Sequence, residues 1–353
     1  MKTERFSLLA FFATLALLLM VFAGWKTFTL NSQAWDMWHV VGHNPVGALL
    51  SGHPHGLRYV VYYPIFAVAE FVGVPPDLVF SYVCVLVLYV MSTLVSQIDS
   101  DVWSSQGHIW RRDAIVLCIF ALAALMNGRL LLAFCGYLFI VSAGANWFKC
   151  REWKLSHAAC VLVGCLLAAV SSGTLLAAMA LSAGVVLIAY IMDSRLLKDN
   201  PLSAISIVMV LVLFVSYALI GIGKNLAYFG GDEAAVVRML GHGAGGDIAK
   251  SIGLGDLVEQ DEIPATEGLL GAVLPYWWLG VVAVALVARY YGWRPVRMVR
   301  ASSPAQNLVH MSIVLAMVGG LFGYSVLMMG VIPLLLFVSG NVKPILSRVG
   351  FSA

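Results

Sequence analysis

The chain has 353 residues, of which 61% are hydrophobic and 11% are charged, and its mean hydropathy is +0.91. Soluble globular domains carry a charge on about a quarter of their residues, so this composition excludes an ordinary soluble enzyme and indicates a protein of the lipid bilayer. The net charge of +3 is small. It reflects cations that anchor spans on the cytoplasmic side, so we expect no nucleic-acid partner.

Apolar stretches of the length that crosses a bilayer recur along the whole chain. They are predicted at 6–25, 77–97, 114–127, 130–148, 157–171, 174–192, 202–222, 269–288, 306–323 and 325–340. The first is long enough to span and no A-x-A site precedes a soluble domain, so we expect no cleaved signal peptide. The predicted fold is all-α: a polytopic integral membrane helix bundle of about ten transmembrane helices, forming a single domain over residues 1–353.

The positions of the 21 lysines and arginines orient these spans. With the N-terminus inside, 15 cations fall on one face, and loops rich in Lys and Arg lie in the cytoplasm. We therefore predict cytoplasmic termini and two large exterior loops, 26–76 and 223–268. The cations left for the exterior face and its membrane edge are Lys26, Arg58, Arg129, Lys224, Arg238 and Lys250.

One apolar segment, 58–74, does not fit this scheme. It is short, it contains Pro64 and Glu70, and Pro75-Pro76 ends it. Counting it as a span would invert every later basic loop, against the charge rule. We therefore predict that it lies in the membrane interface or re-enters the bilayer. The aromatic residues expected at the headgroup level are Tyr59, Tyr62, Tyr63 and Phe66.

Arg129 is the strongest single candidate for a functional role. It follows the apolar run Ala114–Met126 and precedes another that starts at Leu130. A cation at that depth is energetically expensive and usually faces a cavity or a partner. The guanidinium fork donates two parallel hydrogen bonds to a phosphate, which makes a phosphate clamp the favoured role. The alternative is that Arg129 snorkels to the interface from a turn.

Polar residues that could act in acid–base chemistry gather in the first exterior loop. Asp36, His39 and His43 would share one face of a helix, which is a spacing for a divalent metal, although H-x-x-x-H alone is a weak signal. A general base or hydrogen-bonding group is the favoured role, and ordinary interface histidines are the alternative. The candidates for the catalytic role are Asp36, His53 and His55.

The second exterior loop is rich in glycine and acidic near its end, a composition typical of a mobile lid. A plain solvated connector is the alternative. A short helix predicted from Asp232 to Leu240 would bring Arg238 close to His242, four residues later. Together with Lys224, these are the residues of the loop that could face a substrate.

Four features follow one another along the chain: Asp36 after the first span, the stretch Pro64–Gly73, the Asn127-Gly128-Arg129 that opens a span, and the turn Ser171-Ser172-Gly173. This layout resembles that of the bacterial polysaccharide polymerases of the O-antigen polymerase (Wzy) and EpsG-like type. The resemblance covers residues 25–190, with a weaker similarity from Gly323 to Pro333. The His-x-Ser often seen at the later turn of that family is absent here.

The resemblance implies glycosyl transfer on the exterior face of the bacterial inner membrane, with polyprenyl-diphosphate-linked oligosaccharides as donor and acceptor. It implies no nucleotide sugar, no cofactor and no metal; the other partners would be membrane lipid and a chain-length regulator protein. Departure of a lipid diphosphate needs cations at membrane depth, and the attacking hydroxyl benefits from a base. The residues expected to bind the diphosphate are Arg58, Arg129, Lys224, Arg238 and His242.

Two other classes of function remain open. A lipid-linked sugar glycosyltransferase of the GT-C type would add one sugar rather than a repeat unit, and it often coordinates a metal through acidic residues of the first exterior loop. Sensitivity to a chelator would separate it from a polymerase. A membrane transporter or flippase of lipid-linked saccharides would favour inverted repeats with Gly- or Pro-broken spans in paired positions, and we find no such pairing.

Overall fold

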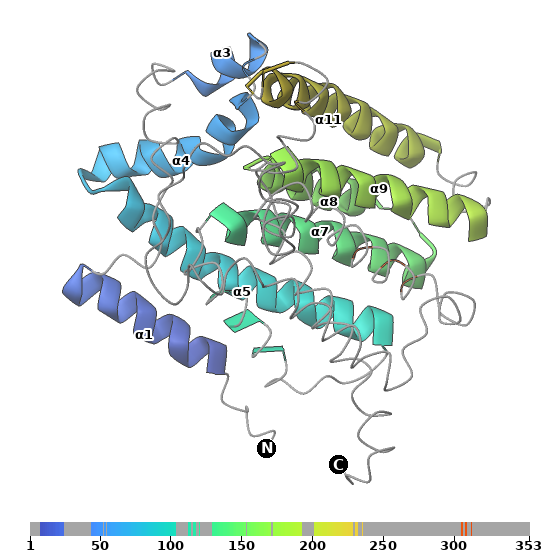
Figure 1. Ribbon diagram of the computed structural model, residues 1–353. Coiled ribbons are helices and arrows are strands. Elements are labelled where there is room, and N and C mark those ends of the chain that lie inside the picture. The colour runs from blue at the N-terminus through green and yellow to red at the C-terminus, as the bar shows by residue number, and fades with distance from the viewer. Residues whose placement is uncertain are drawn as a thin grey trace, which may run out of the picture.

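The structure, a computed structural model, is helical wherever it is described (Figure 1). About 90% of the described residues are helical and no strand occurs among them, which confirms the all-α class for this part of the chain. The described residues are 8–24, 44–51, 53, 55–103, 112, 113, 116, 117, 120, 129–152, 154–170, 172–192, 201–228, 230, 231, 235, 305, 308 and 312.

Two of the described helices are long and apolar enough to cross a bilayer, through Pro76–Val102 and Leu131–Cys150. The predicted spans 269–288 and 325–340 lie outside the described residues, and 114–127 and 306–323 are described at isolated positions only. The number of ten spans therefore stays a prediction. The helices are α1 (Leu8–Ala23), α3 (Pro45–Leu50), α4 (Gly56–Val72), α5 (Pro76–Trp103), α7 (Arg129–Cys150), α8 (Leu155–Ala168), α9 (Ser172–Met192) and α11 (Pro201–Tyr228).

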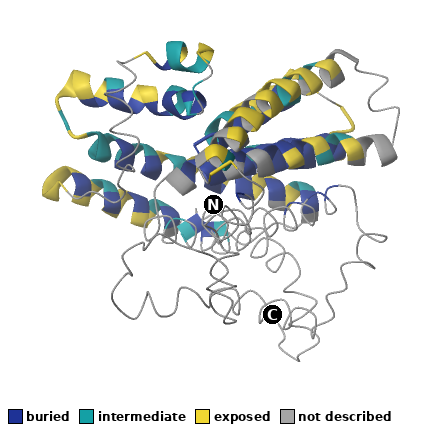
Figure 2. Ribbon diagram, turned by 45° about the horizontal axis from the view of Figure 1, so that its top comes forward, coloured by how far each residue is buried: buried dark blue, intermediate teal, exposed yellow. Residues whose placement is uncertain are grey.

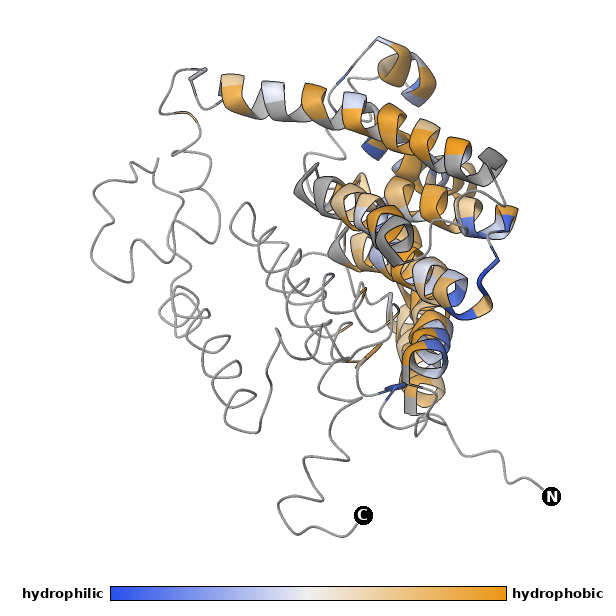
Figure 3. Ribbon diagram, turned by 90° about the vertical axis from the view of Figure 1, so that its right-hand side faces the viewer, coloured by the Kyte–Doolittle hydropathy of each residue, from blue (hydrophilic) through white to orange (hydrophobic). Residues whose placement is uncertain are grey.

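The helices are apolar along their outer as well as their inner faces (Figure 3). Helices α1 and α11 lie at the edges of the described bundle and are exposed along much of their length (Figure 2). Contiguous apolar surface of this kind is unfavourable in water but suits the hydrocarbon of a bilayer. The large exposed side chains on these two helices include Phe11, Phe12, Phe22, Met209, Leu213 and Leu219.

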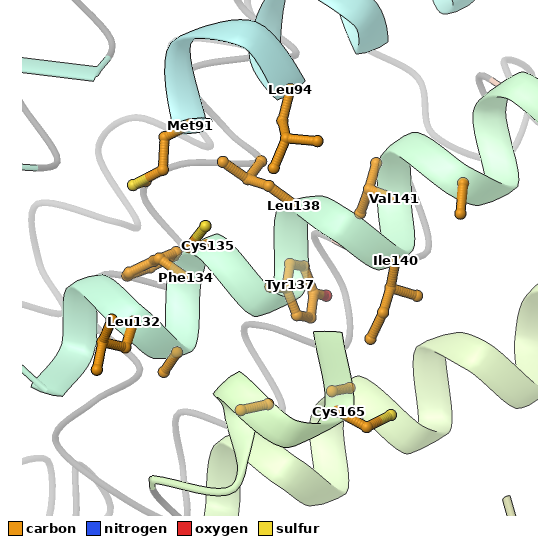
Figure 4. Packing of buried hydrophobic residues seen from close by; sticks show 14 of the residues in the cluster. Met91, Leu94, Leu132, Phe134, Cys135, Tyr137, Leu138, Ile140, Val141 and Cys165 are labelled. Atoms are coloured by element: carbon orange, nitrogen blue, oxygen red, sulfur yellow. The ribbon is translucent and has the colours of Figure 1, made fainter. Parts of the chain in front are cut away.

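Helix α7 is the centre of the described bundle, and it packs against α5, α8 and α9. Its side chains fill the space between its neighbours: Met91 and Leu94 of α5 face Leu138 on one side, and Cys165 of α8 lies below on the other (Figure 4). All four side chains belong to one buried apolar cluster. This central position explains why most of α7 is buried although it is less apolar than the peripheral helices α1 and α11.

Two of the long helices run in the same direction. Gln97 accepts a hydrogen bond from Ser142, and Asp101 accepts one from Asn146 a turn later, so α5 and α7 are parallel. Parallel neighbours require the chain to return between them. This agrees with a crossing near 114–127, from which Val116 packs in the core.

Helix α1 runs antiparallel to α5 and packs against it (Figure 1). The chain between Ala23 and Pro76 therefore leaves and re-enters the bundle at the same end. A full crossing by the segment 58–74 would make α1 and α5 parallel instead. The directions of these two helices thus favour the predicted interfacial or re-entrant placement.

Helix α4 occupies this segment and crosses α5 obliquely at the end of the bundle where α5 begins (Figure 1). It ends at Gly73, whose φ of 72° is in the left-handed region that glycine tolerates without strain. Its four aromatic residues, which were expected at the headgroup level, do not all face outwards. Tyr59, Tyr62 and Phe66 are buried against the protein, because they share one helical face with the core, and only Tyr63 is exposed.

Candidate functional site

A tight corner between α3 and α4 holds three of the predicted site residues. Asn44 starts α3, because its Oδ1 accepts a hydrogen bond from the Gly47 N–H at 2.8 Å, and Pro45 follows as the first helical residue. A Cβ on Gly56 would lie 2.7 Å from the Cα of Leu49, so glycine allows α4 to begin directly against α3. The sequence between the two helices is thereby folded into a compact turn.

Hydrogen bonds of the backbone fix His53 and His55 in this turn. His53 N–H donates to the carbonyl of Ala48 at 2.9 Å, and its own carbonyl accepts from Gly56 N–H at 2.8 Å. The His55 N–H donates to Nδ1 of His53 at 3.2 Å. A ring nitrogen that accepts a hydrogen bond carries no proton, so the neutral His53 ring has its proton on Nε2. The two imidazoles are neighbours, with ring centroids 6.0 Å apart.

Arg58 follows in the first turn of α4, and only 8% of its surface is exposed. Burial of a guanidinium is costly, and such residues usually serve a partner or a polar pathway. The first N–H groups of a helix and its dipole add partial positive charge at the same place. A buried cation, two imidazoles and a helix start therefore concentrate hydrogen-bond donors and positive charge in one corner, which is the chemistry that an anionic oxygen prefers.

Tyr59 packs against this cluster. Its ring centroid lies 5.3 Å from that of His53, and the residue is buried. Its N–H donates to the carbonyl of His55 at 3.1 Å, which is the first backbone bond of α4 after the turn. The sequence interpretation assigned Tyr59 to the lipid interface and missed this contact. His53 and Tyr59 are six residues apart across a turn that contains a proline, and this spacing does not predict a contact between their rings.

Two further predicted cations lie on helices that end or begin at the same end of the bundle (Figure 1). Helix α7 begins at Arg129, as predicted, and its start lies at the end where the parallel helix α5 begins. Helix α11 continues to Tyr228, so Lys224 belongs to its last turns. The helix thus continues for six residues beyond 222, where the predicted span ends, and the exterior position of 223–268 stays a prediction.

The remaining predicted site residues, Asp36, Arg238 and His242, lie outside the described residues, as does the metal spacing of Asp36 with His39 and His43. Of the predicted site, the structure therefore places His53 beside His55, and buried Arg58 follows in the first turn of α4. Among the described residues, no three His, Cys, Asp or Glu side chains are grouped as metal ligands.

Sequence analysis also passed over a polar cluster at the opposite end of α5 and α7. There Asp101 accepts hydrogen bonds from Asn146 and Lys149, and Asn146 contacts His157. These residues come from three helices. In the sequence each is only a polar residue near one end of an apolar run, so the cluster was not predicted.

Comparison with protein-family models, curated proteins and solved structures finds no match for this chain. The function is therefore argued from the chain's own residues.

Proposed function

We propose that the chain is a polysaccharide polymerase that joins polyprenyl-diphosphate-linked repeat units on the exterior face of the bacterial inner membrane. The observation that supports this best is the corner of α3 and α4, where buried Arg58 lies one turn from His53 and His55. The corner belongs to the predicted exterior loop 26–76, on the face that holds few cations. Basic groups buried on this face are suited to bind an anionic ligand that reaches them within the membrane.

In the proposed reaction, the acceptor hydroxyl oxygen attacks the anomeric carbon of the donor saccharide. The new glycosidic C–O bond forms as the bond between the anomeric carbon and the phosphate oxygen breaks. The polyprenyl diphosphate leaves with the bonding electron pair, and the hydroxyl proton passes to a general base. No oxidant, reductant or nucleotide is consumed, because the diphosphate linkage of the donor provides the leaving group.

Arg58 would act on the leaving group. Negative charge grows on the departing diphosphate in the transition state, and a fixed donor placed near that charge stabilises it without having to reorganise. A guanidinium can donate two parallel hydrogen bonds to one phosphate, which a lysine cannot. Arg129 and Lys224, on helices that reach the same end of the bundle, are proposed as further diphosphate contacts, with Arg238 and His242 of the second loop.

Proton transfer would be the role of the imidazoles or of Asp36. His53 has its Nδ1 occupied by the His55 N–H, so its Nε2 would carry the proton in the neutral form, and this ring fits a donor role better than a base role. His55 and Asp36 are then the better candidates for the base. A base near its working pKa contributes about two to four orders of magnitude in rate.

The test is polymerisation by the full-length protein in nanodiscs, supplied with a polyprenyl-diphosphate-linked repeat unit. Arg58→Ala should lower the rate by about two to three orders of magnitude, as expected for loss of one preorganised donor. Arg58→Lys should recover little of that rate. Arg112→Ala is the matched control: this arginine is partly exposed, pairs with Asp113 at 3.0 Å and belongs to the predicted cytoplasmic side, so polymerisation should persist.

Three results would contradict the proposal. One is an Arg58→Ala protein that is folded and fully active. Another is addition of a single sugar that stops when EDTA is added, which would indicate a metal-dependent glycosyltransferase of the GT-C type. The third is movement of the lipid-linked saccharide between leaflets with no polymer formed, which would indicate a flippase.

A further inference from the structure

The ends of α5 and α7 and the start of α8 are joined by one continuous set of hydrogen bonds. Lys149 Nζ donates to Asp101 Oδ1 at 2.7 Å, and Asn146 Nδ2 donates to Asp101 Oδ2 at 3.3 Å. His157 Nε2 lies 3.0 Å from Asn146 Oδ1. Finally, the backbone N–H of Lys154 donates to His157 Nδ1 at 3.0 Å. The set thus links a carboxylate of α5 to the first turn of α8 through α7.

The directions of these bonds require a neutral His157. Nδ1 accepts from a backbone N–H and so carries no proton. The one ring proton is then on Nε2, where it can be donated to the Asn146 carbonyl oxygen. Asn146 thus accepts from His157 through its oxygen and donates to Asp101 through its amide nitrogen. Every donor in the set meets an acceptor only while the imidazole holds a single proton.

His157 also starts α8. It is the third residue of the helix, and its ring accepts the N–H of Lys154, the residue that precedes the helix. Glutamate or glutamine normally fills this position in a capping box, and both carry a side-chain acceptor that stays available near neutral pH. A histidine performs the same task but loses the acceptor when it is protonated.

The charges around His157 come from several elements. Asp101 of α5 is the nearest described carboxylate of the set, but Lys149 already pairs with it at 2.7 Å. The turn before α8 contributes Lys154, which lies 3.7 Å from Glu152, and the exposed Arg151. On α7, Cys150 donates to the same Asn146 oxygen. Helix α9 has no charged residue, and the other helices that contact α8 carry Lys224 on α11 and Arg58 and Glu70 on α4.

We propose that His157 is a pH-sensitive latch that fastens α8 to α7 and α5 when it is neutral and releases the first turn of α8 when it is protonated. A second proton on Nδ1 would point at the Lys154 N–H, so this hydrogen bond is lost and two donors face each other. The Lys154 ammonium in the same turn adds repulsion. The stability that the latch provides is therefore present at neutral and higher pH and decreases as the pH falls. The proposal does not depend on the enzymatic function, because the latch lies at the opposite end of the bundle from the α3–α4 corner.

His157→Gln is the variant that isolates this effect. Glutamine keeps an acceptor at the capping position but does not titrate. The apparent unfolding temperature of the full-length protein in detergent is measured between pH 8 and pH 5. The wild type should lose about 1–3 °C more than the variant over this range, as expected for one cap in a chain of 353 residues. Ser156→Ala, at an exposed position beside His157 in the same turn, is the matched control, and it should show the same loss as the wild type.

Hydrogen–deuterium exchange gives a local measurement that needs no variant. After correction for intrinsic exchange rates, the amides of residues 154–160 in the wild type should exchange several-fold faster at pH 5 than at pH 8. In His157→Gln the corrected rates should agree at both pH values. The proposal is overturned if wild-type protection of this turn does not change with pH. It is also overturned if the folded His157→Gln protein keeps the full sensitivity to acid.

Discussion

The glycine with the least space for a side chain among those described, Gly136 of α7, leads to a sharp prediction. A Cβ built on Gly136 would lie 2.4 Å from the carbonyl oxygen of Gly164 in α8, 2.9 Å from the Cβ of Leu167 and 3.0 Å from the backbone N of Ala168. These atoms belong to the backbone or are attached directly to it, so no flexible side chain can swing away. Gly136→Ala therefore requires the two helices to separate.

The size of the effect follows from two opposing terms. Ordinary van der Waals contact begins near 3.4 Å, so the helices must move apart by about 1 Å, and a gap of that size removes a quarter to a half of each dispersion contact along the interface. Overpacking of this kind costs about 1–3 kcal/mol. Alanine recovers about 0.5–1 kcal/mol in a helix, because it restricts the unfolded chain and has the higher helix propensity. The net change is a loss of about 0–2.5 kcal/mol.

Gly223 of α11 provides the matched control. A Cβ there meets nothing within 4 Å, so Gly223→Ala has the propensity term without the clash. Thermal unfolding of both variants in the same detergent should show a lower midpoint than the wild type for Gly136→Ala and an unchanged or higher midpoint for Gly223→Ala. The reasoning is refuted if both variants shift the midpoint in the same direction by the same amount.

Other substitutions test the fold and the proposed site. Asp113→Asn should cost about 1.5–3 kcal/mol, since the carboxylate accepts the Leu9 N–H at the start of α1 and pairs with Arg112; an unchanged unfolding midpoint would contradict this role. Arg129→Ala should abolish polymer formation at unchanged protein abundance, and Arg129→Lys should rescue it poorly; a fully active alanine variant would remove Arg129 from the site. Asp36→Asn should lower turnover by about two to four orders of magnitude while EDTA leaves the wild-type rate unchanged, and the reverse pattern would favour a metal-dependent glycosyltransferase. A cysteine placed at Ser105, in a chain without its six natural cysteines, should not be labelled by a membrane-impermeant reagent in intact cells, because this position is predicted to be cytoplasmic. Strong labelling would invert the predicted topology.

The sequence by itself predicts the helical class and the positions of most described helices. The predicted spans 130–148 and 174–192 differ by at most two residues at each end from α7 (Arg129–Cys150) and α9 (Ser172–Met192). This works because the ends of a long apolar run are local properties, marked by charges, glycines and small polar residues. The charge bias also argues against a full crossing at 58–74, because one additional crossing would change the side of every later basic loop, and this placement stays a prediction.

Only the tertiary structure decided which side of each helix faces the protein. Tyr59 and Phe66 were assigned to the interface and are buried, and the contact of Gly136 with Gly164 has no signature in either helix alone. In a soluble protein the polar face of a helix reveals the buried one, but in a membrane both lipid and core favour apolar side chains, so this contrast disappears.

The polar cluster at the other end of the bundle was hidden for a related reason. Asp101 and Asn146 are 45 residues apart and meet because α5 and α7 are parallel neighbours, which local sequence does not encode. Hydrogen bonds between side chains of different helices depend on register and rotation, and these are set by the packing of the whole bundle. The sequence determined that helices form and where along the chain their apolar parts lie, whereas the packing determined which of their polar residues meet.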